Sequence, residues 1–396
     1  MATIRVQFVS SLSKTKDQNL WDLTISRIEV FVFRAKIESP VKTSFGVMYD
    51  RPAVLVRVED KDGAFGWGEV WCNFPGCGAD HRVRLIESVF APLVIGHRFN
   101  KSVFHELTET TKTLAIQTGE FGPIAQAIAG LDTALWDLAS RRSALPLYRL
   151  LGGQTRSVPV YASGINPDEP LDTVERCRQS GHRAFKLKVG FDSDSDIGNI
   201  KAVLDTLKAQ EILMIDANQA WNLEIAKGFI GKISELPIFW IEEPIKADRP
   251  IDEWIALAGF SPIPLAAGEN FIDKEMFKTS IDSGSLGFIQ PDISKWGGVT
   301  GCRYVAEYAK RADLKFCPHY LSGGIGFVAS LHLFAGVNGG GVVEMDANQN
   351  PLREGLAQPF PRFEKGRMSI NNEPGLGVAP DLDTVRRYMV LYRDIH

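Results

Sequence analysis

Three acidic residues stand at the ends of short apolar runs spaced about one strand–helix unit apart. The runs end in Met214-Ile215-Asp216, Trp240-Ile241-Glu242 and Ala267-Gly268-Glu269. If each run is a strand of a parallel barrel, the three carboxylates lie at its C-terminal rim, where such barrels carry their chemistry. Carboxylates this close repel one another unless a cation separates them, and oxygen ligands alone suit a hard divalent ion. We therefore predict that Asp216, Glu242 and Glu269 bind Mg²⁺.

A fourth apolar run, at residues 185–189, carries two lysines at alternate positions. The two-residue period of a strand puts Lys186 and Lys188 on one face and three apolar side chains on the other. An exposed strand with protective lysines is the alternative, but a parallel strand is covered on both faces. We expect both lysines to point into the barrel, where burial beside a metal and a second cation lowers the pKa of a lysine base.

Two later runs end in an acid and a histidine, Asp292 and His319, one unit apart. Taken singly, a helix-capping acid and a buried core histidine are the simpler interpretations. Their position at the same strand ends as the other acids favours a dyad in which Asp292 orients His319 and raises its basicity. Glu344 ends an eighth run, and in its protonated form it is expected to hydrogen-bond a substrate oxygen.

The rest of the chain supplies the elements that position these residues. Strand and helix patterns alternate over residues 151–350, which predicts a closed parallel barrel; an open sheet is disfavoured because no GxGxxG motif opens a helix. The predicted strands are residues 158–162, 184–189, 212–216, 238–242, 264–268, 288–291, 315–318 and 341–344. Residues 23–150 combine three antiparallel strands with helices as an α+β domain, and residues 351–396 are expected to run back over it. We interpret residues 1–22 as an N-terminal extension, either disordered or adding a strand.

Composition excludes several classes of partner. The chain is 44% hydrophobic and 23% charged with a net charge of −4, which gives no reason to expect nucleic acid or an anionic membrane as a partner. Its 5 cysteines are scattered and form no CxxC pair, which argues against a zinc site or a disulfide framework and favours the cytoplasm. No apolar run reaches the length of a transmembrane helix, and residues 1–20 lack the apolar core of a signal peptide.

Together these motifs resemble the enolase superfamily, in the mandelate racemase/muconate lactonizing enzyme family and its mandelate racemase subgroup. The resemblance covers the chain from about residue 23. It is carried by Lys186-x-Lys188, Asp216-x-Asn218, Glu242-Glu243-Pro244, Gly268-Glu269-Asn270, Asp292-x-x-Lys295-x-Gly297-Gly298, His319 and Glu344. It implies a modified (β/α)₇β TIM-type barrel with an α+β capping domain and Mg²⁺ held by the three carboxylates. It also implies Lys188 and His319 as bases on opposite faces of the substrate, with Lys186 as an electrostatic partner.

Such a site removes a proton next to a carboxylate and stabilises the resulting ene-diolate. Acid-sugar dehydration, which yields a 2-keto-3-deoxy acid, is the leading prediction on analogy alone. A sugar-acid lactone cycloisomerase is the next alternative, because residues 344–353 resemble the corresponding part of those enzymes, and a 2-hydroxy acid racemase or epimerase is the third. A non-catalytic scaffold is disfavoured, since it has no need of buried charges.

Substrate identity is expected to lie in the capping loops. The candidates for substrate contact are Asn218 at the rim and Phe45, Tyr49, Trp71 and Asn73 in a pocket lid. Packing of these aromatic residues at the domain interface is the alternative. We expect a sugar acid as the substrate, a homo-oligomer between a dimer and an octamer, and Mn²⁺ as a substitute for Mg²⁺.

Overall fold

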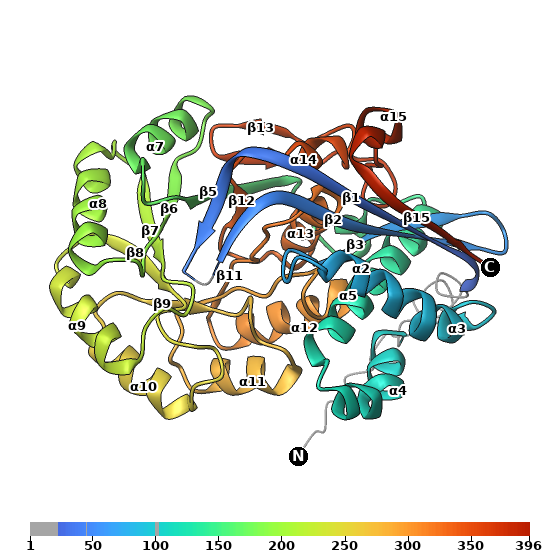
Figure 1. Ribbon diagram of the computed structural model, residues 1–396, viewed down its shortest axis with the longest axis horizontal. Helices are drawn as coiled ribbons and strands as arrows, with labels where there is room; N and C mark the ends of the chain where they lie inside the picture. The colour runs from blue at the N-terminus through green and yellow to red at the C-terminus, as the bar shows by residue number, and fades with distance from the viewer. Residues whose placement is uncertain (1–22, 45, 100–102) are drawn as a thin grey trace, which may run out of the picture.

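A computed structural model describes residues 23–44, 46–99 and 103–396 of the chain (Figure 1). Two β-sheets organise it, one in a capping domain and one closed into a barrel. The predictions made for residues 1–22 and for Phe45 concern positions outside these ranges.

The capping sheet joins the two ends of the described chain. Its strand order is β15-β1-β2-β3, with β4 also paired to β1, so the last strand lies antiparallel beside the first (Figure 1). Its strands are β1 (Leu23–Thr43), β2 (Gly46–Asp60), β3 (Phe65–Val70), β4 (Arg98–Phe99) and β15 (Met389–Ile395). Because β1 and β2 are the longest strands, their hairpin reaches from the capping domain across to the barrel (Figure 1).

Helices cover one face of this sheet, and α5 lies directly on β3. The helical segments of this domain are α2 (Gly78–Leu85), a π-helical turn (Ile86–Phe90), α3 (Ala91–Val94), α4 (Val103–Thr118), α5 (Phe121–Arg142) and α6 (Leu147–Leu150), of which α2 and α5 pack against the strands. Gly66 and Gly68 permit the close approach of β3, since a Cβ atom at Gly68 would lie 1.9 Å from the carbonyl oxygen of Gly130 in α5. This contact holds Glu69, the next residue of β3, in a buried position.

Eight parallel strands form the barrel, which confirms the predicted fold class. They are β5 (Ser157–Ile165), β6 (Ala184–Lys188), β7 (Ile212–Asp216), β8 (Ile238–Glu242), β9 (Leu265–Ala267), β10 (Phe288–Ile289), β11 (Lys315–Phe316) and β12 (Val343–Asp346). Pairing runs in order from β5 to β11, and β12 pairs with β5. The backbone N–H of Glu344 donates to the carbonyl oxygen of Pro318 at 3.2 Å, which links the ends of β12 and β11.

The predicted strands over residues 184–189 and 264–268 extend one residue beyond an observed end, and two others extend by two residues past their C-terminal ends. The strands expected over residues 288–291 and 315–318 end at Ile289 and Phe316. Each prediction ran to a proline, Pro291 or Pro318, and proline has no N–H to donate to a neighbouring strand. The site residues that follow therefore stand on short loops rather than on the strands themselves.

Side chains fill the barrel below its rim. A buried cluster inside it comprises Tyr161, Ala184, Met214, Trp240, Ala266, Phe288 and Cys317. Met214 and Trp240 each lie two residues before a rim carboxylate, so the strand period that sends them inward does the same for Asp216 and Glu242. The outer helices are α7 (Pro170–Gln179), α8 (Ser193–Thr206), α9 (Leu223–Ile233), α10 (Ile251–Phe260), α11 (Lys274–Asp282), α12 (Gly298–Arg311) and α13 (Gly324–Val337).

The C-terminal segment crosses back from the barrel to the capping sheet. It contains α14 (Pro351–Gly355), β13 (Arg362–Glu364), β14 (Arg367–Ser369), α15 (Leu382–Val385) and a 3₁₀ turn (Arg386–Tyr388) before β15. β14 pairs antiparallel with β5, which joins this segment to the barrel. Among the residues described, no helix combines the length and the apolar character needed to span a bilayer.

Candidate active site

The three acids predicted from their spacing meet at one rim of the barrel. Asp216 and Glu242 end the paired strands β7 and β8 and lie directly opposite each other in the sheet. Glu269 follows β9, the next strand. Asp216 and Glu242 are each 1% exposed, and the side chain of Glu269 is 10% exposed. The rim therefore gathers buried negative charge, with Glu269 nearest to its open edge.

Both lysines of β6 point into this cluster. Lys186 Nζ lies 2.6 Å from Glu242, 2.9 Å from Glu344 and 3.5 Å from Asp216. Lys188 Nζ donates to Asp216 at 2.6 Å and to the side-chain oxygen of Asn218 at 2.7 Å. The predicted direction of the two side chains is thus what the structure shows.

The lowering of the lysine pKa that we expect beside a bound metal stays a prediction; among the protein's own side chains, the neighbouring carboxylates raise the pKa of both lysines. Burial alone lowers the pKa of Lys188, but the adjacent Asp216 outweighs it, so the pKa is raised. For Lys186 the carboxylates of Glu242 and Glu344 likewise outweigh burial, and its pKa is raised well above the usual value. Both ammonium groups are therefore charged where they face the carboxylates.

His319 and Asp292 form the predicted dyad. Asp292 Oδ2 lies 2.7 Å from His319 Nδ1, and His319 Nε2 lies 3.0 Å from Glu269 Oε2. Burial lowers the pKa of His319, but Glu269, Glu344 and Asp292 together outweigh it and raise the pKa to about 10. One ring nitrogen is thus occupied by its orienting acid, while the other faces the centre of the rim.

Glu344 is surrounded by hydrogen-bond donors, which favour its carboxylate form over the protonated form needed to donate to a substrate oxygen. It accepts a hydrogen bond from the hydroxyl of Ser163 and another from the backbone N–H of Tyr320 at 3.1 Å. Burial raises its pKa, but His319 and Lys186 outweigh burial and lower it below the usual value. Glu344 is therefore a carboxylate acceptor in this arrangement.

Gln290 and Lys295 also contact the rim acids, although the sequence did not predict them as site residues. Gln290 Nε2 donates to Glu242 at 2.6 Å, and Lys295 Nζ bonds to Asn270 at 2.6 Å and to Glu269 at 3.1 Å. Gln290 carried a readable signal, because it shares the inward parity of Phe288 two residues earlier. Lys295 stood in a quoted motif, but only the folded turn shows that it reaches the rim.

Two backbone positions beside the rim acids are strained. Asn218 and Glu243 adopt positive φ angles of 43° and 42°, a region that costs a residue with a side chain about 1–3 kcal/mol. Asn270 holds Glu243 by donating to both of its carboxylate oxygens, at 3.0 and 2.8 Å. Such strain occurs where surrounding contacts fix side chains in a required place.

The cluster has the charge and the donors to accept a hard divalent ion. Within the described ranges no three His, Cys, Asp or Glu side chains have gathered as a metal-holding group; the carboxylate oxygens turn toward the lysines and His319 instead. Burial, Asp216 and Glu344 nevertheless raise the pKa of Glu242 to about 7 against the influence of Lys186. A further cation beside Glu242 would relieve this excess of negative charge, and oxygen donors suit Mg²⁺.

The candidate lid residues differ in where they lie. The Tyr49 side chain is 71% exposed, whereas the face of the Trp71 ring lies 4.9 Å from Lys295 Nζ. Asn73 is 7% exposed and donates to the carbonyl oxygen of Leu321 at 2.5 Å. Trp71 therefore lies beside the rim, Tyr49 is exposed to solvent, and a role for either in substrate binding stays a prediction.

Among the contacts that tie the β1–β2 hairpin to the barrel, two lie close to the rim acids. The Ser44 hydroxyl donates to the carbonyl oxygen of Asn218 at 2.9 Å. Arg51 and Asp346, at 1% and 3% side-chain exposure, form an ion pair of 2.6 Å between β2 and β12. No local pattern in the sequence marked either pair, since the partners lie far apart in the chain.

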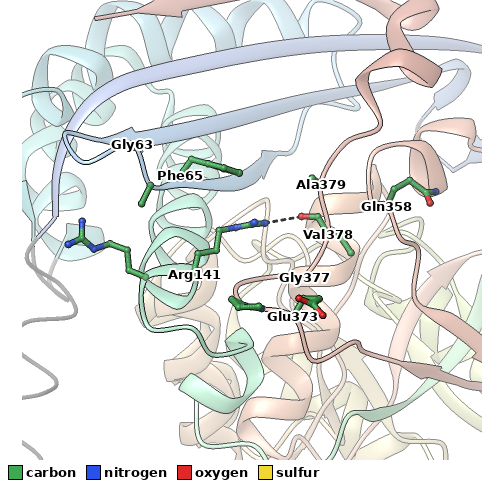
Figure 2. A pocket seen from close by; sticks show the side chains of 11 residues that line it. Gly63, Phe65, Arg141, Gln358, Glu373, Gly377, Val378 and Ala379 are labelled. Atoms are coloured by element: carbon green, nitrogen blue, oxygen red, sulfur yellow. Dashed lines mark hydrogen bonds between the residues drawn. The ribbon is translucent and has the colours of Figure 1, made fainter.

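A large cavity of the protein lies away from this chemistry. It has a volume of about 510 Å³ and opens between the β2–β3 turn, the end of α5 and the C-terminal segment (Figure 2). Arg141 crosses it to bond the carbonyl oxygen of Val378 at 2.9 Å (Figure 2). Because no rim carboxylate or lysine lines it, we place the candidate site at the barrel rim.

Comparison with known sequences identifies the family. Residues 27–152 match the mandelate racemase/muconate lactonizing enzyme N-terminal domain, and residues 171–384 match the enolase C-terminal domain-like family. The chain belongs to the mandelate racemase/muconate lactonizing enzyme family. Within the enolase superfamily, this family membership agrees with the capping domain and barrel described above.

Individual relatives cover most of the chain. Arabinonate dehydratase of Saccharolobus solfataricus is 28% identical over 82% of this chain and 87% of its own length. D-Galactarolactone cycloisomerase of Agrobacterium fabrum is 26% identical over 92% of this chain and 99% of its own. A mandelate racemase/muconate lactonizing enzyme of Bordetella bronchiseptica RB50 is 49% identical, with a TM-score of 0.87 over 92% of this chain and 99% of its own. A racemase of Streptomyces coelicolor A3(2), solved with bound magnesium, is 27% identical, with a TM-score of 0.81 over 92% and 100%.

Proposed function

We propose that this protein is a magnesium-dependent acid-sugar dehydratase that acts through abstraction of the proton next to a carboxylate. The observation that carries the proposal is the placing of two candidate bases. Lys188 contacts Asp216, and His319 contacts Glu269, at distances of 2.6 and 3.0 Å. The two bases come from β6 and from the loop after β11, so they approach the carboxylate cluster from different sides of the barrel.

Asp216, Glu242 and Glu269 are the residues that would hold the ion. Mg²⁺, for which we expect Mn²⁺ to substitute, would supply positive charge to the substrate carboxylate as negative charge develops there. Support comes from the oxygen donors of the rim, from the raised pKa of Glu242 and from the magnesium bound in a structural relative. Lys186, fully buried among these carboxylates, would add a second positive charge on the same side.

The protein's own groups account for the movement of protons. Removing a proton next to a carboxylate is difficult because two negative charges then share one small group, and Lys186 offsets part of that charge. Lys188, once it is freed from Asp216 and has lost its own extra proton to solvent, takes the α-proton as a neutral amine and leaves an ene-diolate. His319, held by Asp292, donates a proton to the β-hydroxyl, which departs as water while the electron pair of the ene-diolate forms the new double bond. The enol that results becomes a 2-keto-3-deoxy acid.

A second function has support of its own. Two of the curated relatives are named as sugar-acid cycloisomerases and match over 99% of their own length. Cycloisomerisation would use the same proton abstraction with a ring oxygen as leaving group instead of a hydroxyl. Racemisation, which needs only return of the proton to the opposite face, is the third candidate.

The proposal also covers the substrate class, the cellular compartment and the oligomeric state of the protein. The substrate class would be a sugar acid or its lactone, by analogy with the names of these relatives. We infer a cytoplasmic homo-oligomer between a dimer and an octamer, in keeping with the free cysteine thiols and with the resemblance to the family. The substrate-binding roles of Asn218, Tyr49 and Trp71 belong to the same proposal.

Proton exchange in D₂O tests the two-base arrangement. A screen of mono- and diacid sugars and their lactones with Mg²⁺ should first detect 2-oxo acid formation or loss of lactone. For a dehydratase, His319→Asn should exchange the α-proton without losing water, and Lys188→Ala should lose no water and keep only the slow residual exchange that His319 supports. The losses should reach about 10²–10⁴-fold, the range for general acid–base catalysis. Near wild-type turnover by both variants would contradict the assignment of the bases.

A further inference from the structure

The segment that follows His319 is held by side chains from outside its own neighbourhood. We call residues 320–326 the histidine loop. Glu69 accepts hydrogen bonds from the backbone N–H groups of Gly323 at 2.5 Å and of Gly326 at 2.9 Å. Asn73 Nδ2 donates to the carbonyl oxygen of Leu321 at 2.5 Å. Two residues of the capping domain therefore bind three peptide units of this loop.

The hydrogen bonds to Glu69 leave the histidine loop little freedom to move. Glu69 is 1% exposed, and its carboxylate caps the N-terminal end of α13, where an anion is favoured by the unpaired N–H groups and the helix dipole. A Cβ atom at Gly323 would stand 2.6 Å from Glu69 Oε1, so a larger residue there would force the Glu69 carboxylate to shift. The loop is thus held at close range against β3.

The histidine loop in turn determines where the His319 imidazole lies. The backbone N–H of His319 donates to the carbonyl oxygen of Pro291 at 3.2 Å, and that of Tyr320 donates to Glu344 at 3.1 Å. These bonds align the start of the loop with the ends of β10 and β12. A displacement of the loop at Leu321 or Gly323 would act directly on this alignment, because only two to four residues separate them from His319.

Lys188 has a different support. Its side-chain partners, Asp216 and Asn218, both belong to the barrel, and Lys188 itself stands within the strand β6. The capping domain reaches this side through the bond from Ser44 to the Asn218 carbonyl oxygen, but not through Lys188 itself. The two bases therefore depend on different parts of the fold.

We propose that Glu69 and Asn73 are positioning residues through which the capping domain sets the place of His319 but not that of Lys188. The inference rests on the proposed function for the role of His319 as an acid or base. Under this proposal the capping domain positions a catalytic side chain in addition to any contact that it makes with the substrate. It also gives Asn73 a contact that accounts for its burial without the substrate contact predicted from the sequence.

The decisive variant is Glu69→Gln, which keeps the shape of the side chain. Its amide group would face one of the two backbone N–H groups donor to donor, so one hydrogen bond is replaced by a repulsive contact and the loop must shift. A misplacement of about 1 Å at a reacting group costs on the order of 10²-fold. We expect a loss of that size in proton transfer by His319.

The effect of Glu69→Gln on each base can be measured separately by adding it to a variant that lacks the other base. The substrate for this assay is a sugar acid that the wild-type protein turns over. In Lys188→Ala the residual exchange of the α-proton in D₂O reports His319, and in His319→Asn it reports Lys188. Adding Glu69→Gln should lower the exchange rate of the Lys188→Ala variant about 10²-fold. It should change the exchange rate of the His319→Asn variant by no more than about twofold. Equal losses in both backgrounds, or no loss in either, would overturn the inference.

Asp137→Asn provides a matched control. Asp137 is also fully buried in the capping domain, and it accepts from the backbone N–H groups of Trp67 at 2.8 Å and of Leu376 at 2.6 Å. It contacts no part of the histidine loop. This variant should lower the melting temperature as Glu69→Gln does while leaving exchange in both backgrounds unchanged.

A spectroscopic readout makes the inference testable without turnover. The proton shared by His319 Nδ1 and Asp292 should give a downfield proton resonance, assigned by its absence in His319→Asn. Glu69→Gln should shift or broaden this resonance, and Asp137→Asn should not. An unchanged resonance in Glu69→Gln would refute the positioning role. If the wild-type protein exchanged no sugar-acid proton, the proposed function would fail, yet the resonance would still decide whether Glu69 positions His319.

Discussion

Replacing Asp292 with Asn should disable His319 by changing which of its nitrogens carries the proton. Asp292 Oδ1 accepts three hydrogen bonds, from the Ser294 N–H at 2.8 Å, the Ser294 hydroxyl at 2.7 Å and the Lys295 N–H at 3.1 Å. Its other oxygen, Oδ2, faces His319 Nδ1 at 2.7 Å. In Asp292→Asn only one of these positions can keep an oxygen.

The three donors decide the orientation of the new amide. Turning its NH₂ group toward them would lose three hydrogen bonds worth about 1 kcal/mol each, roughly 3 kcal/mol in all, which is a population ratio above about 10². The NH₂ group therefore faces His319 Nδ1, and the imidazole must offer a lone pair there. Its proton moves to Nε2, the nitrogen that must accept the α-proton when His319 acts as a base in the exchange assay.

The expected consequence is a large loss confined to the reaction of His319. An Asp-to-Asn change that enforces the wrong tautomer in a Ser-His-Asp triad lowers kcat about 10⁴-fold, and we expect a loss of that order here. The assay is α-proton exchange in D₂O in the Lys188→Ala background, with ¹⁵N chemical shifts of the imidazole as the structural readout. Ser294→Ala, which removes one donor and keeps Asp292, serves as the control. A loss below about tenfold, or a ring that stays protonated at Nδ1, would refute the reasoning.

Three further predictions concern the metal and stability. Glu269→Gln should weaken Mg²⁺ binding by at least on the order of 10–100-fold, the loss seen even for outer partners of a metal site, as measured by calorimetry; unchanged affinity, or turnover with a chelator present, would contradict the three-carboxylate site. Arg51→Met should destabilise the protein by about 3–5 kcal/mol in urea unfolding, because it leaves the buried carboxyl group of Asp346 without its ion-pair partner; a loss under about 1 kcal/mol would show that water reaches the pair. Burial lowers the pKa of His332 to about 3, so its stabilising contribution is present above the unfolded value of 6.5 and is lost as pH falls toward 3, by up to about 5 kcal/mol. His332→Asn should then unfold with a smaller pH dependence between 7 and 4 than the wild type, and equal slopes would count against a neutral His332.

Much of the candidate site could be predicted because it repeats along the chain. Asp216 and Glu242 end apolar runs of the same length, and in parallel strands equal positions meet at one rim, so residue spacing alone places them together. The alternation of Phe185-Lys186-Leu187-Lys188 likewise determines which side chains enter the barrel. These patterns depend only on residues within one strand or one strand–helix unit. They can therefore be read from the sequence without knowledge of contacts between distant segments.

Other features of the site depend on contacts between residues far apart in the chain, and only the tertiary structure shows these contacts. Glu69 lies more than two hundred residues from Gly323 in the chain, and only the docking of β3 against the start of α13 brings them together. The direction of the Lys188 pKa shift depends on the distance to Asp216, since burial and a nearby carboxylate act in opposite directions. The sequence by itself determined the types of groups at the rim and the parity that turns them inward; distances, partners and the reach of the capping domain arose from contacts between segments far apart in the chain.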